Sequence, residues 1–308
     1  MSQPKIVVVG TSNVDIVVRT PHIPRPGETV VGSDWIQAAG GKGANQAVAA
    51  ARLGAQVHLV ACIGTDVFGN ATWDNLRQEG LDLTHVRRLE AAPTGIALII
   101  VDDKGQNSIA VAPGANSRLS PQLVQEAAKD ILDCDAVLIQ LEIPLETAEY
   151  AASLAKQGRA TVILNPAPAQ PLNEAFLRSV DILTPNEVEA SVLAGLPVSD
   201  LASAEKAARA LLARGPRQVI ITLGSEGALL GSQGTMAHIP GFPVKAADTT
   251  AAGDAFNGAL ACAIAQGMDM RQAIRYANAV GALSVTKMGA QPSLPYAAEV
   301  ESFLSTQT

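Results

Sequence analysis

The sequence predicts an α/β protein in which a mostly parallel sheet lies between two layers of helices, a three-layer α/β/α arrangement with a small β-sheet added. Short apolar runs rich in β-branched residues recur along the chain, as in strands that are buried on both faces. Segments of helical period separate these runs, and such alternation forms right-handed parallel crossovers. The composition allows a sizeable core, because 48% of the 308 residues are hydrophobic and 17% are charged.

The elements follow in order along the chain. The apolar runs predict strands at 5–9, 57–63, 136–139, 161–164, 182–183 and 218–222. The intervening patterns predict helices at 44–53, 67–79, 121–132, 146–156, 187–193 and 204–212. Beyond residue 253 the pattern becomes mostly helical, at 255–266, 270–285 and 297–304. We therefore expect a single α/β domain over residues 1–308.

Two segments break this alternation. Residues 20–37 contain PHIPRPGETVVGSDW, which is too rich in Pro and Gly for a helix. Residues 94–111 predict two strands around the turn-like DDKGQ. We expect the two segments to pair as a small sheet outside the main one, with excursions at about 14–38 and 94–112. This sheet is either a lid near the ligand edge or an ordinary surface insertion.

Composition excludes several classes of function. The formal net charge of −7 argues against a nucleic-acid or anionic-membrane partner, because both require concentrated positive charge. The cysteines and histidines lack the spacings of a disulfide framework or a metal motif, so we expect structural or surface roles. They are Cys62, Cys134, Cys262, His22, His58, His85 and His238. No apolar stretch approaches the roughly 20 residues of a membrane helix, and the chain starts directly with a strand, which favours the cytoplasm.

Polar residues or glycines follow nearly every apolar run, where the strands are expected to end. Ligands of open parallel sheets bind outside the carboxyl ends of the strands, so we expect these residues to line a ligand site. They are Asn13, Asp15, Gly40, Gly41, Lys42, Gly43, Asn45, Glu142, Asn165, Asn186, Glu189, Gly224, Gly227 and Asp254.

The segment GGKGAN at 40–45 is neither of the common glycine-rich phosphate motifs. A Walker A loop needs Ser or Thr after the Lys, and Gly follows Lys42 here. A GxGxxG motif needs a final Gly, and Gln46 stands at that position. The segment is either a plain turn before a helix or a cluster of N–H, ammonium and amide donors for a polyhydroxy ligand.

Two further motifs each have a structural and a functional interpretation. In TPNEVE, Asn186 and Glu189 share a helix face, either as a capping pair or as an amide and a carboxylate around the waters of Mg²⁺. TLGSEGA is either a turn between strands or a glycine-rich segment on which a nucleotide lies flat.

The segment AAGD at 251–254 combines small residues with a carboxylate at an expected helix start. Successive N–H groups at such a helix N-terminus can converge on an anion, helped by the helix dipole. Asp254 is then either an N-cap or a base that accepts a proton from an attacking hydroxyl.

These motifs resemble a known family over essentially the whole chain. GGKGANQAVAAARLGA at 40–55 and DTTAAGDAFNGAL at 248–260 are similar to the two signature regions of the PfkB carbohydrate kinase family. NPAPA at 165–169, TPNE at 184–187, ITLGSEGA at 221–228 and VTKMGAQPS at 285–293 resemble its ribokinase branch. The resemblance implies a ribokinase-like fold that transfers a phosphoryl group from ATP to O5 of D-ribose, giving D-ribose 5-phosphate and ADP. It also implies Mg²⁺, K⁺ as a monovalent activator, and a homodimer whose β lids form a clasp.

The resemblance assigns roles to matching positions. The sugar would be held by Asn13, Asp15, Gly41, Lys42, Asn45 and Glu142. Asp254 would be the base, and Ala251, Ala252 and Gly253 the anion hole. Asn186 and Glu189 would serve the phosphates and Mg²⁺, and the nucleotide would be lined by Thr222, Gly224, Ser225, Glu226, Gly227, Gly253 and Asn278. The monovalent cation would lie at Asp248, Thr250, Ser284, Lys287, Gly289 and Ser293, partly through backbone carbonyls.

Two positions carry finer expectations. Many family members have Gly at the position of Ala251, so we expect the anion loop to form here without a positive φ. The amide of Asn13 favours ribose over deoxyribose, because a site built for the missing hydroxyl would be left unpaired. Alternatives are a sister kinase for deoxyribose, a ketohexose or a nucleoside, and a sugar-binding regulator without activity. A dinucleotide-dependent dehydrogenase is disfavoured, because GTSNVD lacks its glycine fingerprint.

Overall fold

The protein contains a large sheet covered by helices and a smaller sheet that projects from it. A computed structural model describes residues 3–307, so residues 1, 2 and 308 of the expected domain lie outside the described residues. The parallel strands of the large sheet are β1 (Lys5–Val9), β4 (Gln56–Gly64), β5 (Val86–Leu89), β8 (Ala136–Gln140), β9 (Thr161–Asn165), β10 (Ile182–Leu183) and β11 (Gln218–Thr222). An antiparallel hairpin of β12 (Ala228–Ser232) and β13 (Thr235–Ile239) completes the order β13-β12-β11-β10-β9-β8-β1-β4-β5.

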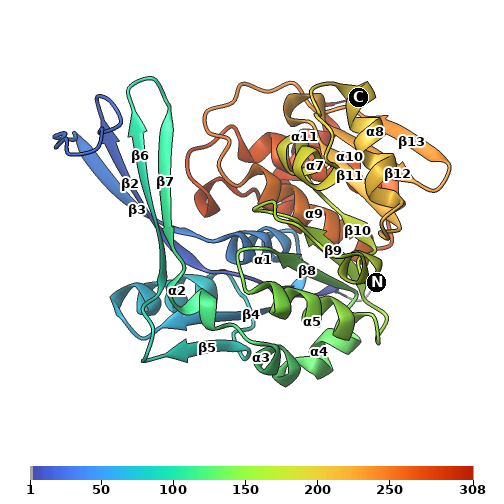
Figure 1. The fold of residues 1–308 in the computed structure, drawn as a ribbon, viewed down its shortest axis with the longest axis horizontal. Coiled ribbons are helices and arrows are strands. Elements are labelled where there is room, and N and C mark those ends of the chain that lie inside the picture. Colours follow the sequence, from blue (N-terminus) through green and yellow to red (C-terminus); the bar gives the residue numbers. More distant parts are fainter. Residues whose placement is uncertain (1–2, 308) are drawn as a thin grey trace.

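Both faces of the large sheet are covered by helices (Figure 1). One apolar core contains Ile6 and Val8 of β1, and the other contains the alternate residues Val7 and Val9. The first core is formed with α1 (Lys42–Arg52), α2 (Val67–Gln78), α9 (Ala252–Ala265), α10 (Met270–Ser284) and α11 (Ala297–Ser305). The second is formed with α3 (Pro121–Glu126), α4 (Ala128–Asp133), α5 (Leu145–Ala155), α6 (Glu174–Arg178), α7 (Glu187–Ala194) and α8 (Leu201–Leu212). The predicted three-layer α/β/α class is confirmed.

The small sheet consists of the two segments that interrupt the βα alternation. Its strands are β2 (Asn13–Thr20), β3 (Asp34–Gly40), β6 (Gly95–Asp102) and β7 (Asn107–Ala112), in the order β3-β2-β6-β7. Asn13 pairs with both Gly40 and Gly95 where this sheet joins the body. The hairpins extend from there, away from the helices, so the base of the small sheet lies at the carboxyl edge of the large one (Figure 1).

The structure differs from the expected elements in a few places. The predicted helix at 121–132 is two helices, because the backbone of Ala127 (φ −91°, ψ 7°) leaves helical geometry between α3 and α4. Strands β5, β12 and β13 were not expected, since VRRL is short and charged and the hairpin mixes Gly and polar residues. Within residues 3–307, no helix combines the length and the apolar character needed to cross a membrane.

Two helix N-termini are set side by side by unusually close packing. A Cβ on Gly258 of α9 would lie 2.6 Å from Ala49 Cβ and 2.7 Å from the Gln46 carbonyl oxygen, both on α1. Only glycine allows the two backbones to approach this closely. The starts of α1 and α9, which carry the two signature motifs, are therefore held together.

Candidate active site

Asp254 lies in the first turn of α9 and is held by amides from α1. Its side chain is buried, and its Oδ2 accepts a hydrogen bond from Asn45 Nδ2 at 2.9 Å. Its Oδ1 accepts one from Gln46 Nε2 at 3.0 Å. The N-cap of α9 is Ala251, three residues earlier, so Asp254 does not cap this helix. Both carboxylate oxygens are instead oriented by side chains from the other signature segment.

A buried amide network extends from Asp254 to the carboxyl ends of the central strands. Gln140, the last residue of β8, donates to Gln46 Oε1 at 2.6 Å. Gln46 Nε2 also lies 3.2 Å from Asn165 Oδ1 at the end of β9. Neither Gln46 nor Gln140 was among the residues predicted for the site. Their signal was available, because a glutamine at a strand end and another inside an apolar helix both need buried partners.

Several carboxylates surround one ammonium group in this region. Burial raises the pKa of Asp254, and the Lys42 ammonium and the α1 amides oppose this only in part. Burial, together with the charges of Glu142 and Asp254, raises the pKa of Asp15 to about 6. Burial would lower the pKa of Lys42, but the carboxylates around it, Asp254 foremost, raise it, so Lys42 stays charged. With a pKa of about 6, Asp15 can exchange a proton near neutral pH.

The base of the small sheet brings Asn13 and Asp15 to the same region. Asn116 donates to Asn13 Oδ1 at 2.7 Å, and its own Oδ1 accepts from the Ser12 N–H at 3.0 Å. This pairing orients the amide NH₂ of Asn13 for another acceptor. Asn116, which is almost fully buried, was also missed from the sequence, because nothing in its local pattern indicates a partner about 100 residues away.

The glycines of GGKGAN allow the sheet and α1 to approach one another. A Cβ on Gly40 would collide with the Asp15 carboxylate. Gly41 has φ 89°, and a Cβ there would lie 2.6 Å from the Asn13 nitrogen. The segment is therefore more than a turn before a helix, since its glycine backbone packs against Asn13 and Asp15, two of the residues predicted to bind the sugar.

The predicted anion loop at 251–253 differs from the expectation in its backbone. Ala251 has φ 60° and is the only residue other than glycine with a positive φ among residues 3–307. The expectation that the loop forms without a positive φ is wrong. The left-handed conformation at the N-cap points the chain into α9, and for Ala it costs roughly 1 kcal/mol.

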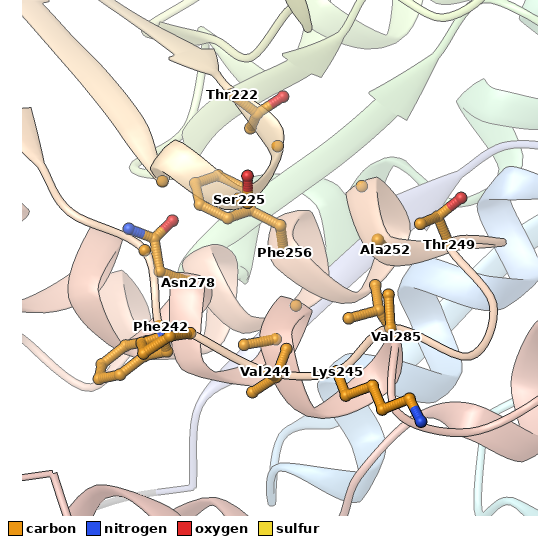
Figure 2. A pocket seen from close by; sticks show the side chains of 18 residues that line it. Thr222, Ser225, Phe242, Val244, Lys245, Thr249, Ala252, Phe256, Asn278 and Val285 are labelled. Carbon is orange, nitrogen blue, oxygen red and sulfur yellow. The ribbon is translucent and has the colours of Figure 1, made fainter.

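A cavity of about 770 Å³ lies beside the N-terminus of α9 (Figure 2). Residues predicted to contact the nucleotide line it: Thr222, Gly224, Ser225, Gly227, Gly253 and Asn278. Ala252 also lines it, whereas the predicted Glu226 and Asn186 do not. The opposite wall, 241–246, was missed because its apolar loop carries no motif. Asn278 fixes this wall by donating to the carbonyls of Ile239 and Pro240, each at 3.1 Å.

Asn186 and Glu189 form a capping box at the start of α7. The Asn186 side chain accepts from the Glu189 N–H at 2.8 Å, and Glu189 Oε2 accepts from the Asn186 N–H at 2.9 Å. Glu189 is buried, which raises its pKa, while the Asn186 N–H and Lys42 act in the opposite direction. The carboxylate therefore faces the charged group around Lys42 as well as capping the helix.

Part of the predicted monovalent-cation group is joined by hydrogen bonds. Asp248 Oδ1 accepts from the Thr250 N–H at 2.9 Å and from its hydroxyl at 2.6 Å. Asp248 Oδ2 accepts from the Gly289 N–H at 2.9 Å. One carboxylate thus connects the loop before α9 with the loop after α10.

The other three members of that group have different contacts. The Lys287 N–H donates to the Ser284 carbonyl at 3.3 Å, and its ammonium pairs with Glu299 at 2.7 Å. The Ser293 hydroxyl donates to the Ala290 carbonyl at 2.8 Å. The Lys287 ammonium therefore points to an acidic partner outside the predicted group.

The family model described as pfkB family carbohydrate kinase matches residues 3–297. The chain belongs to this family. It is therefore a kinase, and the paired helix starts and the cavity beside Asp254 are its candidate active site.

Relatives within the family are similar over nearly their full length. A ribokinase from Haemophilus influenzae is 46% identical over 299 residues, covering 97% of this chain and 98% of the relative. A deoxyribokinase from Salmonella typhi is 38% identical over 301 residues, with 97% and 98% covered. The solved structure of a ribokinase from Arabidopsis thaliana complexed with ribose and ATP has a TM-score of 0.91 at 34% identity, covering 98% of this chain and 99% of that one.

Proposed function

We propose that this protein transfers the γ-phosphoryl group of ATP to O5 of D-ribose. The observation that carries the proposal is the position of Asp254, buried at the start of α9 with both oxygens held by amides and directly after Ala252 and Gly253, which line a large cavity. The ribokinase relatives, one of them complexed with ribose and ATP, support the choice of substrates.

The sugar is held between α1 and the base of the small sheet, by Asn13, Asp15, Gly41, Lys42, Asn45 and Glu142. Asn45 donates its amide NH₂ to Asp254, while its Oδ1 is buried without a hydrogen-bond partner among residues 3–307. A buried acceptor of this kind needs a donor, and a sugar hydroxyl provides one. Glu142 is positioned by the Thr11 hydroxyl, which donates to its Oε2 at 2.6 Å.

Asp254 acts as the general base in this proposal. As the sugar O5 attacks the γ-phosphorus, its proton passes to the Asp254 carboxylate, and the bond between the γ-phosphorus and the bridging oxygen breaks to release ADP. The backbone N–H groups of Ala251, Ala252 and Gly253 stabilise the charge on the transferring group, aided by the N-terminus of α9. The raised pKa of Asp254 makes its carboxylate a better proton acceptor than an exposed aspartate.

Nucleotide and metal ions occupy the other side of Asp254. ATP lies in the cavity lined by Thr222, Gly224, Ser225, Gly227 and Asn278, with Glu226 at the turn beside it. Glu189 and Asn186 would hold Mg²⁺, largely through water, and the bound ion would neutralise phosphate charge. The buried carboxylate of Glu189, with the Asp254 carboxylate in the same region, fits a divalent cation.

A monovalent cation is the second metal ion of the proposal. The residues that would hold K⁺ are Asp248, Thr250 and Gly289, together with backbone carbonyls from 284, 287 and 293. Oxygen donors of this type suit a hard cation, and the Asp248 carboxylate already connects the two loops concerned.

The small sheet serves as a lid and as the contact between two copies of the chain. Four of its apolar residues in register, Ile36, Val17, Ile99 and Ile109, form a row across all four strands. Ile36 and Ile109 are each 54% exposed, and an exposed apolar row of this kind favours burial against another surface. The small sheet of a second copy of the chain would bury this face. We also propose that the enzyme acts in the cytoplasm, where ATP is available.

A coupled assay of ATP consumption over a panel of sugars tests the proposal. We expect kcat/KM for D-ribose to exceed that for 2-deoxy-D-ribose, a ketohexose and a nucleoside by at least about 10-fold. The deoxyribokinase relative makes deoxyribose the second candidate. Asn13→Ala should lower the ratio of kcat/KM for D-ribose to kcat/KM for 2-deoxy-D-ribose, because Asn13 is assigned to the hydroxyl that deoxyribose lacks. A higher kcat/KM for any other acceptor would overturn the ribose assignment.

A further inference from the structure

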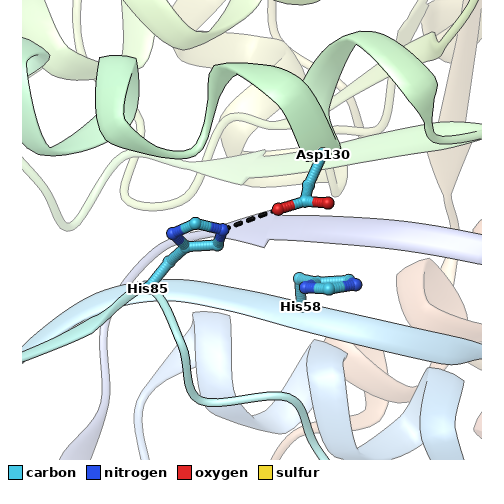
Figure 3. Close-up of side chains that lie close together, drawn as sticks. All are labelled: His58, His85 and Asp130. Carbon is cyan, nitrogen blue, oxygen red and sulfur yellow. Dashed lines mark hydrogen bonds and ion pairs between the residues drawn. The ribbon is translucent and has the colours of Figure 1, made fainter.

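Two histidines that are 27 residues apart in the sequence converge with an aspartate at the edge of the large sheet (Figure 3). His58 lies near the start of β4, His85 lies just before β5, and Asp130 lies on α4. One potential ligand atom from each residue lies within 4.8 Å of the other two. The cluster is near the amino end of β4, whereas the kinase site is at the carboxyl ends of the strands.

The two imidazoles are largely shielded, and the carboxylate faces solvent. The side chains of His58 and His85 are 15% and 13% exposed, and that of Asp130 is 37% exposed. His85 Nε2 lies 2.8 Å from Asp130 Oδ2. An ion can therefore reach the cluster from the solvent-exposed side of Asp130, where the two shielded imidazoles already lie close together.

One ring nitrogen of the cluster is not satisfied by the protein. His58 Nδ1 is buried and has no hydrogen-bond partner among residues 3–307. Asp82 Oδ2 lies 3.6 Å from it, which is too long for a hydrogen bond. Asp82 Oδ1 accepts from the Thr84 N–H at 2.9 Å, so Asp82 is fixed in place with its second oxygen toward His58.

The donor set points to a particular class of ion. Two imidazole nitrogens and one carboxylate oxygen, with a position left for water, form a common arrangement around Zn²⁺. Mg²⁺ and Ca²⁺ prefer oxygen ligands, so they are poor matches for two imidazoles. Ligand bonds of about 2.0–2.2 Å place the donors of a tetrahedral shell roughly 3.3–3.5 Å apart. Small side-chain rotations bring the three donors to this spacing.

We propose that His58, through its Nε2, binds a divalent transition-metal ion of the zinc class together with His85 and Asp130, and that binding turns the His58 ring so that its Nδ1–H donates to Asp82. Carboxylates commonly hold the second nitrogen of a metal-bound imidazole and fix its orientation. The bound ion connects β4, the segment before β5 and α4. Because only the folded chain presents these ligands together, the ion stabilises the native state.

The test uses the full chain, freed of metal by a chelator and dialysed, with ZnCl₂ alone as the probe. We expect calorimetry to detect a site with a dissociation constant on the order of 1 μM or below, and the melting temperature to rise with added Zn²⁺. His58→Gln, His85→Gln and Asp130→Asn should each remove this site, and Asp82→Asn should weaken it by about 10-fold or more. All four variants should keep the kinase activity of the metal-free protein measured with Mg²⁺ and ATP.

Two controls separate this site from other binding. His238→Gln, which changes an exposed histidine on β13, and Asp254→Asn, which changes the kinase site, should both retain the Zn²⁺ signal. Co²⁺ in place of Zn²⁺ should give the visible absorption of a tetrahedral nitrogen and oxygen site in the unaltered chain, a readout that does not depend on folding of a variant. The proposal is overturned if Zn²⁺ binding is unchanged in the three ligand variants, or if the unaltered chain shows neither the calorimetric site nor the Co²⁺ absorption.

Discussion

At the scale of residues, the site is defined by carboxylates that share a single ammonium group. Asp15, Glu142, Glu189 and Asp254 all act on Lys42, which stays protonated among them. Asp15 is held with a pKa of about 6, against a usual value near 3.8. A carboxyl group in this state binds its proton more tightly in the folded protein than in the unfolded chain. At neutral pH, where Asp15 is ionised, its carboxylate therefore destabilises the folded protein relative to the unfolded chain.

Asp15→Asn should stabilise the substrate-free protein in a pH-dependent way. Between pH 3.8 and about 6 the folded state binds more protons than the unfolded state, so the free energy of unfolding falls as the pH rises. Asn has no proton to lose, and at pH 8 the variant should gain about 1–3 kcal/mol, with the difference shrinking below pH 4. Urea denaturation at several pH values measures this.

The exposed carboxylate Asp103, at the tip of the small sheet, provides the control for that series. Asp103→Asn should change the stability little at any pH. A gain for Asp15→Asn that is the same at pH 4 and pH 8, or a loss at pH 8, would contradict the electrostatic account.

Some residues of the candidate site could be predicted from the sequence alone, and others could not. Asp254 and the residues of GGKGAN lie in short segments whose composition is unusual, so they could be found by inspection. The partners of Gln46, Gln140 and Asn116 could not be found in this way, because these buried contacts join residues about 90 to 120 positions apart. The φ of 60° at Ala251 was also hidden, since Ala gives no sign of a left-handed conformation.

At the scale of elements, the close packing of α1 on α9 positions the two signature motifs. Gly258 is the contact point, with α1 backbone and Ala49 immediately against it. Gln46, whose carbonyl is part of that contact, also donates to Asp254. Separation of the two helices would therefore disturb the proposed base as well as the core.

Gly258→Ala should lower both stability and turnover. The added methyl group would lie 2.6 Å from Ala49 Cβ, and overpacking of this kind costs about 1–3 kcal/mol. We expect kcat to fall as well, because α1 carries both amides that hold Asp254. Chemical denaturation and steady-state kinetics measure the two effects.

Gly281 is a matched control within the neighbouring helix α10. A Cβ there meets only the Ala252 carbonyl oxygen at 3.6 Å, an ordinary contact. Gly281→Ala should leave the stability unchanged or raise it by about 0.5–1 kcal/mol. Equal losses of stability in Gly258→Ala and Gly281→Ala would mean that the α1–α9 contact has no special role.

Elements with a strong period were predictable, and short or mixed ones were not. The buried strands and the long helices α1, α5, α9 and α10 match their expected positions within a few residues. The break at Ala127 was missed because PQLVQEAAKDIL keeps one helical pattern through it. Strand β5 was missed because pairing with β4, rather than its own apolar content, makes it a strand.

At the scale of the whole molecule, the small sheet leaves an apolar surface that the chain itself does not cover. Trp35 and Leu98 are 62% and 47% exposed on one face, and the row from Ile36 to Ile109 occupies the other. Apolar residues on both faces of a projecting sheet favour burial against a second copy.

Ile36→Ser combined with Ile109→Ser should weaken the proposed dimer by at least about 10-fold, because both substitutions remove apolar area from the same row. Sedimentation or light scattering gives the mass. Val188→Ser with Val192→Ser, on the exposed face of α7, is the matched control and should leave the mass unchanged. A chain that is a monomer before any substitution would contradict the dimer.

Topology also explains why the histidine cluster could not be predicted. His58 and His85 have no metal-binding spacing, and the sequence indicated structural or surface roles. They come together only because β5 pairs with β4 and α4 packs over that edge. Such convergence of distant residues depends on the fold as a whole.

The central claim, that Asp254 is the base for phosphoryl transfer to D-ribose, is tested most directly by the turnover of Asp254→Asn with saturating D-ribose and ATP. Asn keeps the size of the side chain and loses the carboxylate that accepts the proton. We predict a fall in kcat of at least about 10², with ATP binding by calorimetry retained. Turnover close to that of the unaltered protein would contradict the account.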